Sequence, residues 1–400
     1  MIVYRPEENA LLVWNSELAR TAYICGEDLE ELERWVHSGS SGYIDRLKSL
    51  GLVSDADKDA VATAIAQSRI IQAPTCSFAA PESLHIELIE YCPLNCLQCY
   101  KGSGGNSSLD IGFLISVIQQ AKEMQVFQIA LGGGEPLLYP DLLRVVSEIH
   151  QSNMAVSITS SGYGLDNQTL DELIACGLNH IQISLNGSCE EIDSKSRSSY
   201  DYAIAALELF QNHKASFGIN WVARRDNVYD FLDFVQVVKG YKVDNINILR
   251  YKPTEHERYE DNNLSAEDMA FLAQAIKNTN GIPIKVDSAF SSLRCHLSQQ
   301  VSFMSGCGAG RRFLAISADG YYRPCSHVEI KESATSLRQV WYNSNNLEMF
   351  RAIDSKVGEP CAKCEYLPGC HGCRAIILGQ GNDFFAGHED CPYTTCIKEQ

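Results

Sequence analysis

Apolar residues in the middle of the chain follow two spacings, one typical of buried strands and one typical of helices. Six short apolar runs predict strands at 84–89, 127–131, 155–159, 180–185, 216–222 and 245–249. Between and after them, apolar positions recur every three or four residues and predict helices at 110–124, 141–152, 168–176, 201–212, 230–239 and 266–278. Six strand–helix units in succession predict an α/β fold, in which helices wrap a parallel sheet.

The sheet of this central unit, which we place at residues 82–285, can lie open or curve into a partial barrel. We expect a partial (β/α)6 barrel. In both arrangements the carboxyl ends of the strands meet at one edge, and ligands bind at that edge. Candidate chemistry is therefore sought in the loops that directly follow the strands.

Residues 1–75 follow a different pattern. Strands are predicted at 11–13 and 52–53, and helices at 28–36 and 42–51. Strands combined with short helices predict a small winged-helix-like domain. The stretch 73–81 contains two prolines and several small residues, so it predicts a linker to the central unit.

The chain has 400 residues and a formal net charge of −17. This charge disfavours nucleic acid and anionic membranes as partners, and it favours small molecules or peptides that are neutral or basic. The first residues lack a basic start before an apolar run, and no apolar stretch is long enough to span a membrane. We therefore expect a cytoplasmic protein. In a reducing compartment its 16 cysteines are expected to be metal ligands or catalytic groups.

The cysteines are distributed unevenly along the chain. Four isolated ones are interpreted as small buried thiols, namely Cys25, Cys76, Cys176 and Cys189. Three lie together after the first strand of the central unit, and nine lie beyond residue 290. Residues 290–400 also have weak periodicity and short apolar runs. We expect bound metal to stabilise this region as a third domain.

The first group of cysteines has the spacing CxxxCxxC. It reads Tyr91-Cys92-Pro93-Leu94-Asn95-Cys96-Leu97-Gln98-Cys99-Tyr100. Three thiolates in one loop can bind three irons of a [4Fe–4S] cluster and leave the fourth iron open. An open coordination position is what a catalytic metal centre needs. Zinc is the alternative, with His85 on the preceding strand as the nearest further ligand.

This motif resembles that of the radical S-adenosylmethionine (SAM) enzymes, in which CxxxCxxC and an aromatic residue follow the first strand. The sequence Gly132-Gly133-Gly134-Glu135-Pro136 after the second strand resembles the family's Gly-Gly-Glu-Pro motif. The resemblance implies that the amino and carboxylate groups of SAM bind the open iron. It implies that Glu135 contacts the amino group, and it places Tyr100, Gly133 and Gly134 in the same site. Glycines allow a close approach of backbone and ligand, and a carboxylate can accept hydrogen bonds from an ammonium group.

Two further strand ends resemble family motifs with substitutions. Ser160-Ser161-Gly162 stands where many relatives have Thr-Asn-Gly, and Ser184-Leu185-Asn186-Gly187 stands where they have Ser-Leu-Asp-Gly. The resemblance makes Ser161, Ser184 and Arg197 candidate SAM ligands, the last two for its carboxylate and ribose. For Ser161 and Arg197 the alternative is a strand-end turn residue and a solvated charge.

The C-terminal cysteines resemble the SPASM extension of radical SAM enzymes, which holds two auxiliary [4Fe–4S] clusters. The resemblance assigns Cys307, Cys325 and Cys373 to the first auxiliary cluster, and Cys361, Cys364, Cys370 and Cys391 to the second. Seven thiolates leave one iron uncovered. Cys295 could fill that position, or the position could stay open for substrate, whereas Cys396 matches no family cysteine. Two zinc ribbons are the alternative interpretation.

The residues after Cys325 bear on the reaction. Sulfatase-maturing relatives place an aspartate that acts as a base directly after the matching cysteine. Here Ser326 and His327 follow, which argues against that activity. His327 and His371 could tune clusters through hydrogen bonds, or they could be ordinary polar packing. No catalytic base is assigned from the sequence.

The resemblance implies a radical SAM enzyme with SAM and three [4Fe–4S] clusters as cofactors. We expect a 5′-deoxyadenosyl radical that oxidatively modifies a ribosomally made precursor peptide, through a thioether or carbon–carbon cross-link. Flavodoxin or ferredoxin would be the reducing partner. Residues 1–75 resemble leader-recognition domains of the PqqD family, which bind a leader peptide as an added strand; a structural cap is the alternative. Sulfatase maturation, another non-crosslinking peptide modification and a non-catalytic zinc-binding peptide scaffold also remain open.

Overall fold

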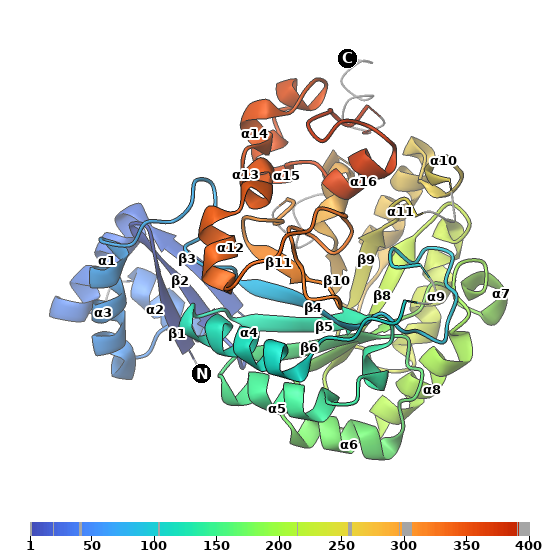
Figure 1. Ribbon diagram of the computed structural model, residues 1–400, viewed down its shortest axis with the longest axis horizontal. Helices are drawn as coiled ribbons and strands as arrows, with labels where there is room; N and C mark the ends of the chain where they lie inside the picture. Colours follow the sequence, from blue (N-terminus) through green and yellow to red (C-terminus); the bar gives the residue numbers. More distant parts are fainter. Residues whose placement is uncertain are drawn as a thin grey trace.

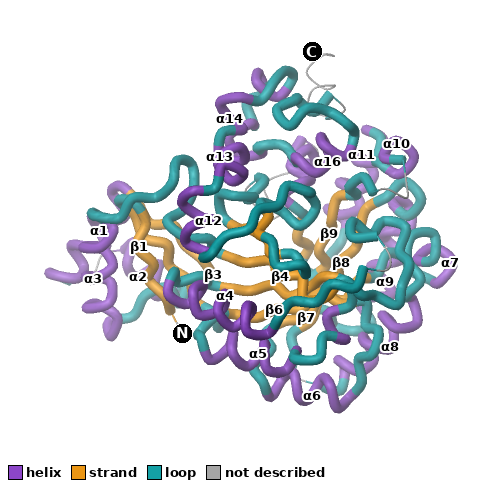
Figure 2. The backbone as a smooth tube through the Cα atoms, in the orientation of Figure 1, coloured by secondary structure: helices purple, strands orange, loops and turns teal. Residues whose placement is uncertain are grey.

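A nine-stranded sheet forms the centre of the molecule (Figures 1 and 2). The computed structural model describes residues 2–18, 20–39, 42–102, 105–213, 215–254, 258–295, 297, 306–389 and 391. The strand order is β10-β9-β8-β7-β6-β5-β4-β11-β12, and every neighbouring pair except β11–β12 is parallel. All six predicted strands of the central unit are present, as β4 (Ser83–Ile89), β5 (Gln128–Gly133), β6 (Ala155–Ser160), β7 (His180–Ser184), β8 (Phe217–Ala223) and β9 (Ile246–Arg250).

Helices cover one side of this sheet, as Figure 1 shows for α4, α5 and α6. The six predicted helices are α4 (Ile111–Glu123), α5 (Leu142–Gln151), α6 (Asn167–Ala175), α8 (Tyr200–Gln211), α9 (Phe231–Lys239) and α11 (Ala266–Asn278), with the short α7 (Glu190–Asp193) and α10 (Tyr259–Asn262) besides. Helix α4 begins where Asp110 accepts a hydrogen bond from the Phe113 amide at 2.8 Å. The predicted α/β fold is confirmed. No helix among the described residues is long and apolar enough to cross a membrane.

The two faces of the central strands differ in polarity. On β4, Leu84, Ile86 and Leu88 are buried in the core that the strands share with the helices. Successive side chains of a strand point to opposite faces, so His85 and Glu87 point to the other side. The same alternation puts Ser157, Thr159, Gln182, Ser184, Asn220 and Asn247 on that side. The face that the helices leave free is therefore lined with polar groups, which is where a polar ligand can be held.

The hydrophobic pattern does not predict three short strands, β10 (Ile284–Val286), β11 (Phe313–Ile316) and β12 (Tyr322–Arg323). Strand β11 pairs in parallel with β4, from Phe313 beside Ser83 to Ile316 beside Ile86. The C-terminal segment thereby extends the sheet next to its first parallel strand. In the part of the chain that the structure describes, no pairing joins β10 to β12, so the sheet is open between these edges.

The rest of the C-terminal segment consists of short helices over the central sheet, at the top of Figure 1. They are α12 (Leu337–Asn343), α13 (Asn345–Arg351), α14 (Ile353–Lys356), α15 (Leu367–Cys370) and α16 (Arg374–Gly379). Elements this short show little helical periodicity, which explains the weak pattern in the sequence. A small apolar core joins α13 to α16, and Cys307, Cys325, Cys361 and Cys373 pack against it, whereas α12 packs into the main core.

The N-terminal residues form their own sheet and core. The order along the chain is β1 (Ile2–Glu7), β2 (Ala10–Asn15), β3 (Arg20–Cys25), α1 (Gly26–Ser38), α2 (Gly42–Ser49) and α3 (Lys58–Ser68), and the three strands form an antiparallel meander. The predicted strand at 52–53 is wrong. Gly51, at φ 69°, ends α2, and Leu52 and Val53 then pack into the N-terminal core. The sequence pattern also missed β1, β3 and α3.

A buried ion pair attaches this N-terminal unit to the central sheet. Arg5 Nε donates to Glu7 Oε1 at 2.7 Å, and both side chains are only 2% exposed. Arg5 Nη1 donates to the Pro81 carbonyl at 2.8 Å, and Glu7 accepts from the Ala79 amide at 2.5 Å. The Arg5 guanidinium also lies over the Phe127 ring, 4.6 Å from its centroid. Each charge is thus matched by the other and held by the backbone of the linker, although Arg5 Nη2 has no hydrogen-bond partner among the described residues.

We predict that Arg5→Met destabilises the junction by about 3–5 kcal/mol, because it leaves the Glu7 carboxylate buried without a counter-charge. Urea unfolding monitored by proteolysis of the 69–82 segment measures this loss. The double variant Arg5→Met/Glu7→Leu should lose less than the single variant, since no uncompensated charge remains. Equal losses in the single and double variants would contradict the role of the pair.

Candidate active site

The CxxxCxxC loop leaves the carboxyl end of β4 and brings its three thiols together. Burial raises the pKa of Cys92 to about 11, and the charges of Glu135, Cys96 and Cys99 add to this effect. Burial also raises the pKa of Cys99, to which Cys96 contributes. The Leu97 amide donates to the Ser196 carbonyl at 3.0 Å and so ties the loop to the segment after β7. The predicted trio therefore shares one place in the fold.

The glycine-rich end of β5 packs directly on the chain that leads into this loop. The Gly134 amide donates to the Ile89 carbonyl at 2.6 Å, and the Glu135 amide donates to the Tyr91 carbonyl at 2.9 Å. A Cβ atom at Gly134 would overlap the carbonyl oxygens of Tyr91 and Glu90. Glycine is required at this position because two backbones meet there without room for a side chain.

Glu135 is 1% exposed and its carboxylate is held by donors from the next strand end. Oε1 accepts from Ser160 Oγ at 2.7 Å, and Oε2 accepts from Ser161 Oγ at 2.5 Å and from the Ser161 amide at 3.0 Å. Burial nevertheless raises the pKa of Glu135, although these hydrogen bonds oppose the effect. In the structure Ser161 therefore supports Glu135, which is a contact that its predicted role as a SAM ligand did not include.

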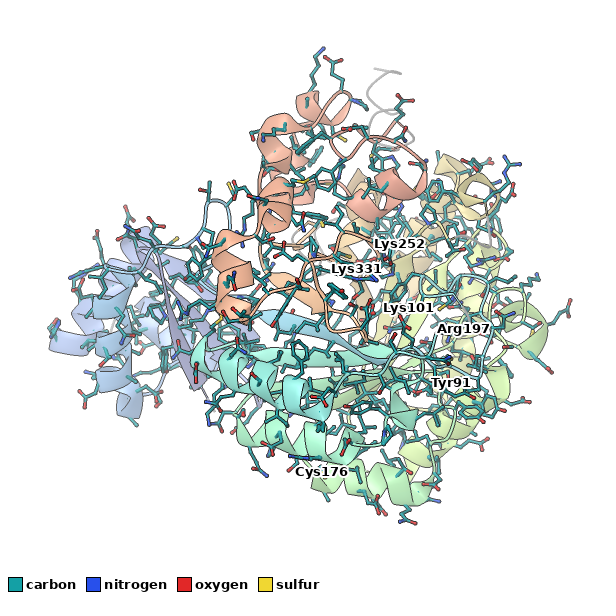
Figure 3. All side chains as sticks on the ribbon, viewed as in Figure 1. Tyr91, Lys101, Cys176, Arg197, Lys252 and Lys331 are labelled. Atoms are coloured by element: carbon teal, nitrogen blue, oxygen red, sulfur yellow. The ribbon has the colours of Figure 1, made fainter. Side chains whose placement is uncertain are left out.

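Arg197 lies beside the first cysteine group. Its charge acts to lower the pKa of Cys99, although burial raises that pKa overall, and its Nε donates to Ser199 Oγ at 3.2 Å. Figure 3 shows Arg197, Lys101 and Tyr91 in one part of the view, well away from Cys176. Arg197 thus lies beside the first cysteine group, and its role as a SAM ligand stays a prediction.

The motif 184–187 at the end of β7 contains one residue with a structural role, Asn186, and one candidate SAM ligand, Ser184. Asn186 is 1% exposed; its Nδ2 donates to Ser196 Oγ at 2.9 Å, and its Oδ1 accepts from the Val222 amide at 2.9 Å. It therefore fixes the loop that carries Arg197. Ser184 lies on the polar face of the sheet, so its role as a SAM ligand stays a prediction.

Tyr100 connects the first cysteine loop to the C-terminal segment. Its hydroxyl donates to Glu87 Oε1 at 3.1 Å, and its ring lies 4.3 Å from the ring of His327. Lys101 Nζ donates to Glu87 Oε2 at 2.7 Å, so the buried Glu87 carboxylate has a counter-charge. Burial lowers the pKa of His327 to about 3, so this ring is neutral at pH 7. The two cysteine-bearing regions thus meet through an aromatic contact.

The C-terminal cysteines lie close together, and the Cys307 amide donates to the Cys370 carbonyl at 3.0 Å although the two residues are predicted to belong to different sets. Burial raises the pKa of Cys307 to about 12, and the charges of Cys373 and Cys325 add to the rise. Burial also raises the pKa of Cys361, with smaller contributions from Cys370 and Cys364. These influences are consistent with Cys307, Cys325 and Cys373 in one set and Cys361, Cys364 and Cys370 in the other, and the assignment of the sets stays a prediction.

Cys391, His371 and Cys295 were also assigned from the sequence. The Cys391 amide donates to the His388 carbonyl at 3.3 Å, and the His388 amide donates to Cys361 Sγ at 3.2 Å, which links Cys391 to the second set. His371 Nδ1 and Asp354 Oδ1 are 2.7 Å apart, so this histidine is tied to the helix before the set. The side chain of Cys295 and all of Cys396 lie outside the described residues.

Two charged residues that sequence reasoning missed lie at neighbouring strand ends. Lys252 follows β9 and Asp287 follows β10, and Lys252 Nζ donates to Asp287 Oδ2 at 3.1 Å. Burial is the largest single effect on the pKa of Asp287 and acts to raise it, but the charge and hydrogen bond of Lys252 together with the Ala289 amide and His327 lower the net pKa. Both residues influence the charge of Cys325. Their positions directly after strands were the available signal, although the sequence does not show that the two residues pair.

The four isolated cysteines are not all buried thiols. Cys176 is half-buried and packs against the main core, whereas Cys25, Cys76 and Cys189 are exposed. The prediction is therefore wrong for these three. Residue type alone did not reveal that they occupy a strand edge, a linker and a loop.

The cysteine thiols of the first group and of the two C-terminal sets suit iron–sulfur clusters. Thiolates are the usual protein ligands of such clusters, and the raised thiol pKa values mean that binding would release protons. Within the described residues, no three His, Cys, Asp or Glu side chains converge on a position for a single metal ion. Arg374, a buried cation among the C-terminal thiols, has two donor nitrogens, Nε and Nη2, without a partner in the described part of the chain. Anionic clusters would supply both the charge and the acceptors.

Comparison with known families gives the same assignment. The model of the radical SAM superfamily matches residues 86–238, and that of the SPASM iron–sulfur cluster-binding domain matches residues 307–365. The chain belongs to the radical SAM superfamily and carries a SPASM domain. It is therefore a radical SAM enzyme that uses SAM and iron–sulfur clusters, which argues against the non-catalytic zinc scaffold.

Several characterised proteins are similar to this radical SAM protein. PqqA peptide cyclase of Gluconobacter oxydans (strain 621H) is 26% identical over 322 residues, which cover 74% of this chain and 87% of the relative. The structure of Streptococcus suis SuiB bound to precursor peptide SuiA has a TM-score of 0.76 at 16% identity and covers 98% of both chains. Native anSMEcpe with bound AdoMet has a TM-score of 0.63 at 18% identity, covering 79% of this chain and 96% of that one. Both structures share the fold.

We predict that Gly134→Ala removes the first cysteine group's cluster, because the new methyl group must displace the Tyr91 carbonyl just before Cys92. Iron per reconstituted chain should fall by about four. Gly132→Ala is the matched control, since a Cβ there meets nothing within 4 Å. If both variants keep the full iron content, the close approach is not needed to hold the loop.

We predict that Glu135→Gln weakens SAM binding by about 10–100-fold, which corresponds to one charge-assisted hydrogen bond. Equilibrium dialysis with the reconstituted enzyme measures the dissociation constant. Ser160→Ala keeps the carboxylate and removes only one of its supports, so it should lose no more than a few-fold. Unchanged SAM affinity in Glu135→Gln at full iron content would exclude Glu135 as a ligand.

Proposed function

We propose that this enzyme is a peptide maturase that oxidatively cross-links a ribosomally made precursor peptide. The observation that carries the proposal is the presence of the radical SAM site and two further cysteine sets in one sheet-centred fold. SAM bound at the first cysteine group supplies a 5′-deoxyadenosyl radical when the cluster is reduced. The clusters held by the two further cysteine sets would accept the electron that the peptide loses, which suits a net oxidation of the peptide.

Three separate clusters are part of this proposal. Cys92, Cys96 and Cys99 would hold the first. Cys307, Cys325 and Cys373 would hold the second, and Cys361, Cys364, Cys370 and Cys391 would hold the third. Similarity to PqqA peptide cyclase and to SuiB, which was solved with its precursor peptide, supports a peptide substrate. Flavodoxin or ferredoxin is the proposed electron donor, because reductive cleavage of SAM needs an electron from outside the chain.

The peptide would bind on the polar face of the sheet. It would lie between the first cysteine loop on one side and the Lys252–Asp287 pair on the other. The chain's own residues would exclude water there and hold the reacting carbon near the SAM site. Asp287 is a carboxylate at pH 7, since its pKa is lowered, so it can accept a proton that the peptide loses. Lys252 holds that carboxylate in place through their 3.1 Å contact.

The N-terminal unit (residues 1–75) is the proposed leader-binding domain. Strand β3 pairs with β2 along one side, and among the described residues its other side has no strand partner. Tyr23 on β3 is 51% exposed. An open strand edge beside an exposed aromatic residue suits a peptide that binds as an added strand. The Arg5–Glu7 junction would keep this edge at a fixed position relative to the central sheet.

Sulfatase maturation is the less favoured alternative. Ser326 and His327 follow Cys325, so the carboxylate expected directly after that cysteine is missing. The bond that the enzyme forms in its peptide, a thioether or a carbon–carbon link, belongs to the proposal and is decided by the product.

Anaerobic reconstitution with SAM, reductant and a candidate precursor peptide tests the function. We predict 5′-deoxyadenosine together with a peptide that has lost two hydrogen atoms for each cross-link. Cys96→Ala should form neither product, whereas Cys176→Ala should match the wild type, because Cys176 lies away from the site (Figure 3). Cleavage of SAM with an unmodified peptide would contradict the substrate, and absence of cleavage would contradict the chemistry.

A further inference from the structure

Arg374, at the start of α16, is a buried cation that lies beside both C-terminal cysteine sets. Its side chain is 1% exposed. Burial lowers the pKa of its guanidinium, and the charges of four thiols oppose that effect. These are Cys373 and Cys307 of the first set and Cys361 and Cys370 of the second. The positive charge of one guanidinium therefore interacts with thiols of both sets.

The hydrogen bonds of Arg374 use only part of its donor capacity. Nη1 donates to the Phe384 carbonyl at 2.7 Å and to the Ala386 carbonyl at 3.0 Å. Nε and Nη2 are buried and have no hydrogen-bond partner in the described part of the chain. No carboxylate among the described residues forms an ion pair with Arg374 either. A buried cation with unpaired donors is costly unless an anion is supplied.

Two other buried arginines of the same segment show the difference. Arg323 also has a buried Nε without a partner among the described residues, but its two Nη atoms contact the Glu329 carboxylate, with both N–O distances at 3.0 Å. Arg351 donates to the Gly310 carbonyl at 2.8 Å and to the Trp341 carbonyl at 2.7 Å, and no cysteine influences its pKa. Arg374 alone of these three combines free donors with thiol neighbours.

We propose that Arg374 is the shared counter-charge of the two C-terminal cysteine sets and sets the reduction potential of the clusters they hold. The inference rests on the proposal that each set holds an iron–sulfur cluster. Reduction adds a negative charge to a cluster, so a nearby fixed positive charge and N–H donors to its sulfurs stabilise the reduced form. The electron that the substrate loses is the electron that such a cluster gains. Arg374 is thus a positioning residue that makes electron acceptance more favourable.

An anaerobic redox titration monitored by electron paramagnetic resonance tests this role without any peptide. It uses the full reconstituted chain with Cys92, Cys96 and Cys99 replaced by alanine, so that only the C-terminal clusters contribute. Arg374→Gln should lower the potential of at least one cluster by 59 mV or more, a tenfold change in its one-electron equilibrium. Arg374→Lys keeps the charge and should shift the potential less. Arg351→Gln is the matched control and should leave both potentials unchanged.

The outcomes separate this inference from the proposed function. Unchanged potentials in Arg374→Gln at full iron content would overturn the role of Arg374. If Arg374→Gln loses iron while Arg374→Lys keeps iron and potential, the counter-charge role is supported. If both Arg374 variants and Arg351→Gln lose iron alike, the role is merely structural and the inference fails. Absence of two cluster signals in the parent chain would instead contradict the proposed cluster assignment.

Discussion

The hydrogen-bond ladder of β4 is the constraint on which the rest of the site depends. On one side β4 pairs with β5, which carries the glycine-rich loop and Glu135, and on the other side it pairs with β11 of the C-terminal segment. The first cysteine loop leaves the same strand. One strand therefore fixes three parts of the site that lie far apart in sequence, because parallel pairing sets their register. Close packing of Gly134 against the Tyr91 carbonyl then leaves the loop little freedom.

The buried charges around this strand are of two kinds. Some form ion pairs that stabilise the structure, and one is a cation to which we assign a functional role. Arg5 with Glu7 and Lys101 with Glu87 are closed pairs, with each charge matched inside the protein. Arg374 has no such partner among the described residues. The closed pairs fix the N-terminal unit and the first cysteine loop, whereas the unmatched cation indicates where an anionic group belongs. The hydrophobic core lies on the helix side of the sheet and stabilises the strands from which these charged residues and cysteine loops extend.

Much of the fold could be predicted because its signals are local. The strands β4 to β9 carry apolar residues at regular positions over short stretches, and the spacing of the first cysteine group is visible within one loop. The strands β10 to β12 could not be predicted, since two to four residues give no period and their pairing is decided by β4 and β9. For a related reason, the sequence did not predict roles for Lys252, Asp287 and Arg374. Their roles depend on neighbours that are distant in sequence. The exposed Cys25, Cys76 and Cys189 show that residue type does not decide burial.

Native mass spectrometry of the anaerobically purified chain tests the central claim most directly, which is that three separate thiol sets each hold one cluster. The account predicts a mass excess over the apo chain equal to three [4Fe–4S] units, with about twelve irons and twelve sulfides. It also predicts that replacing the cysteines of one set removes one unit and leaves the other two. A mass excess of a few zinc ions without sulfide, or loss of all clusters from any single replacement, would contradict the account.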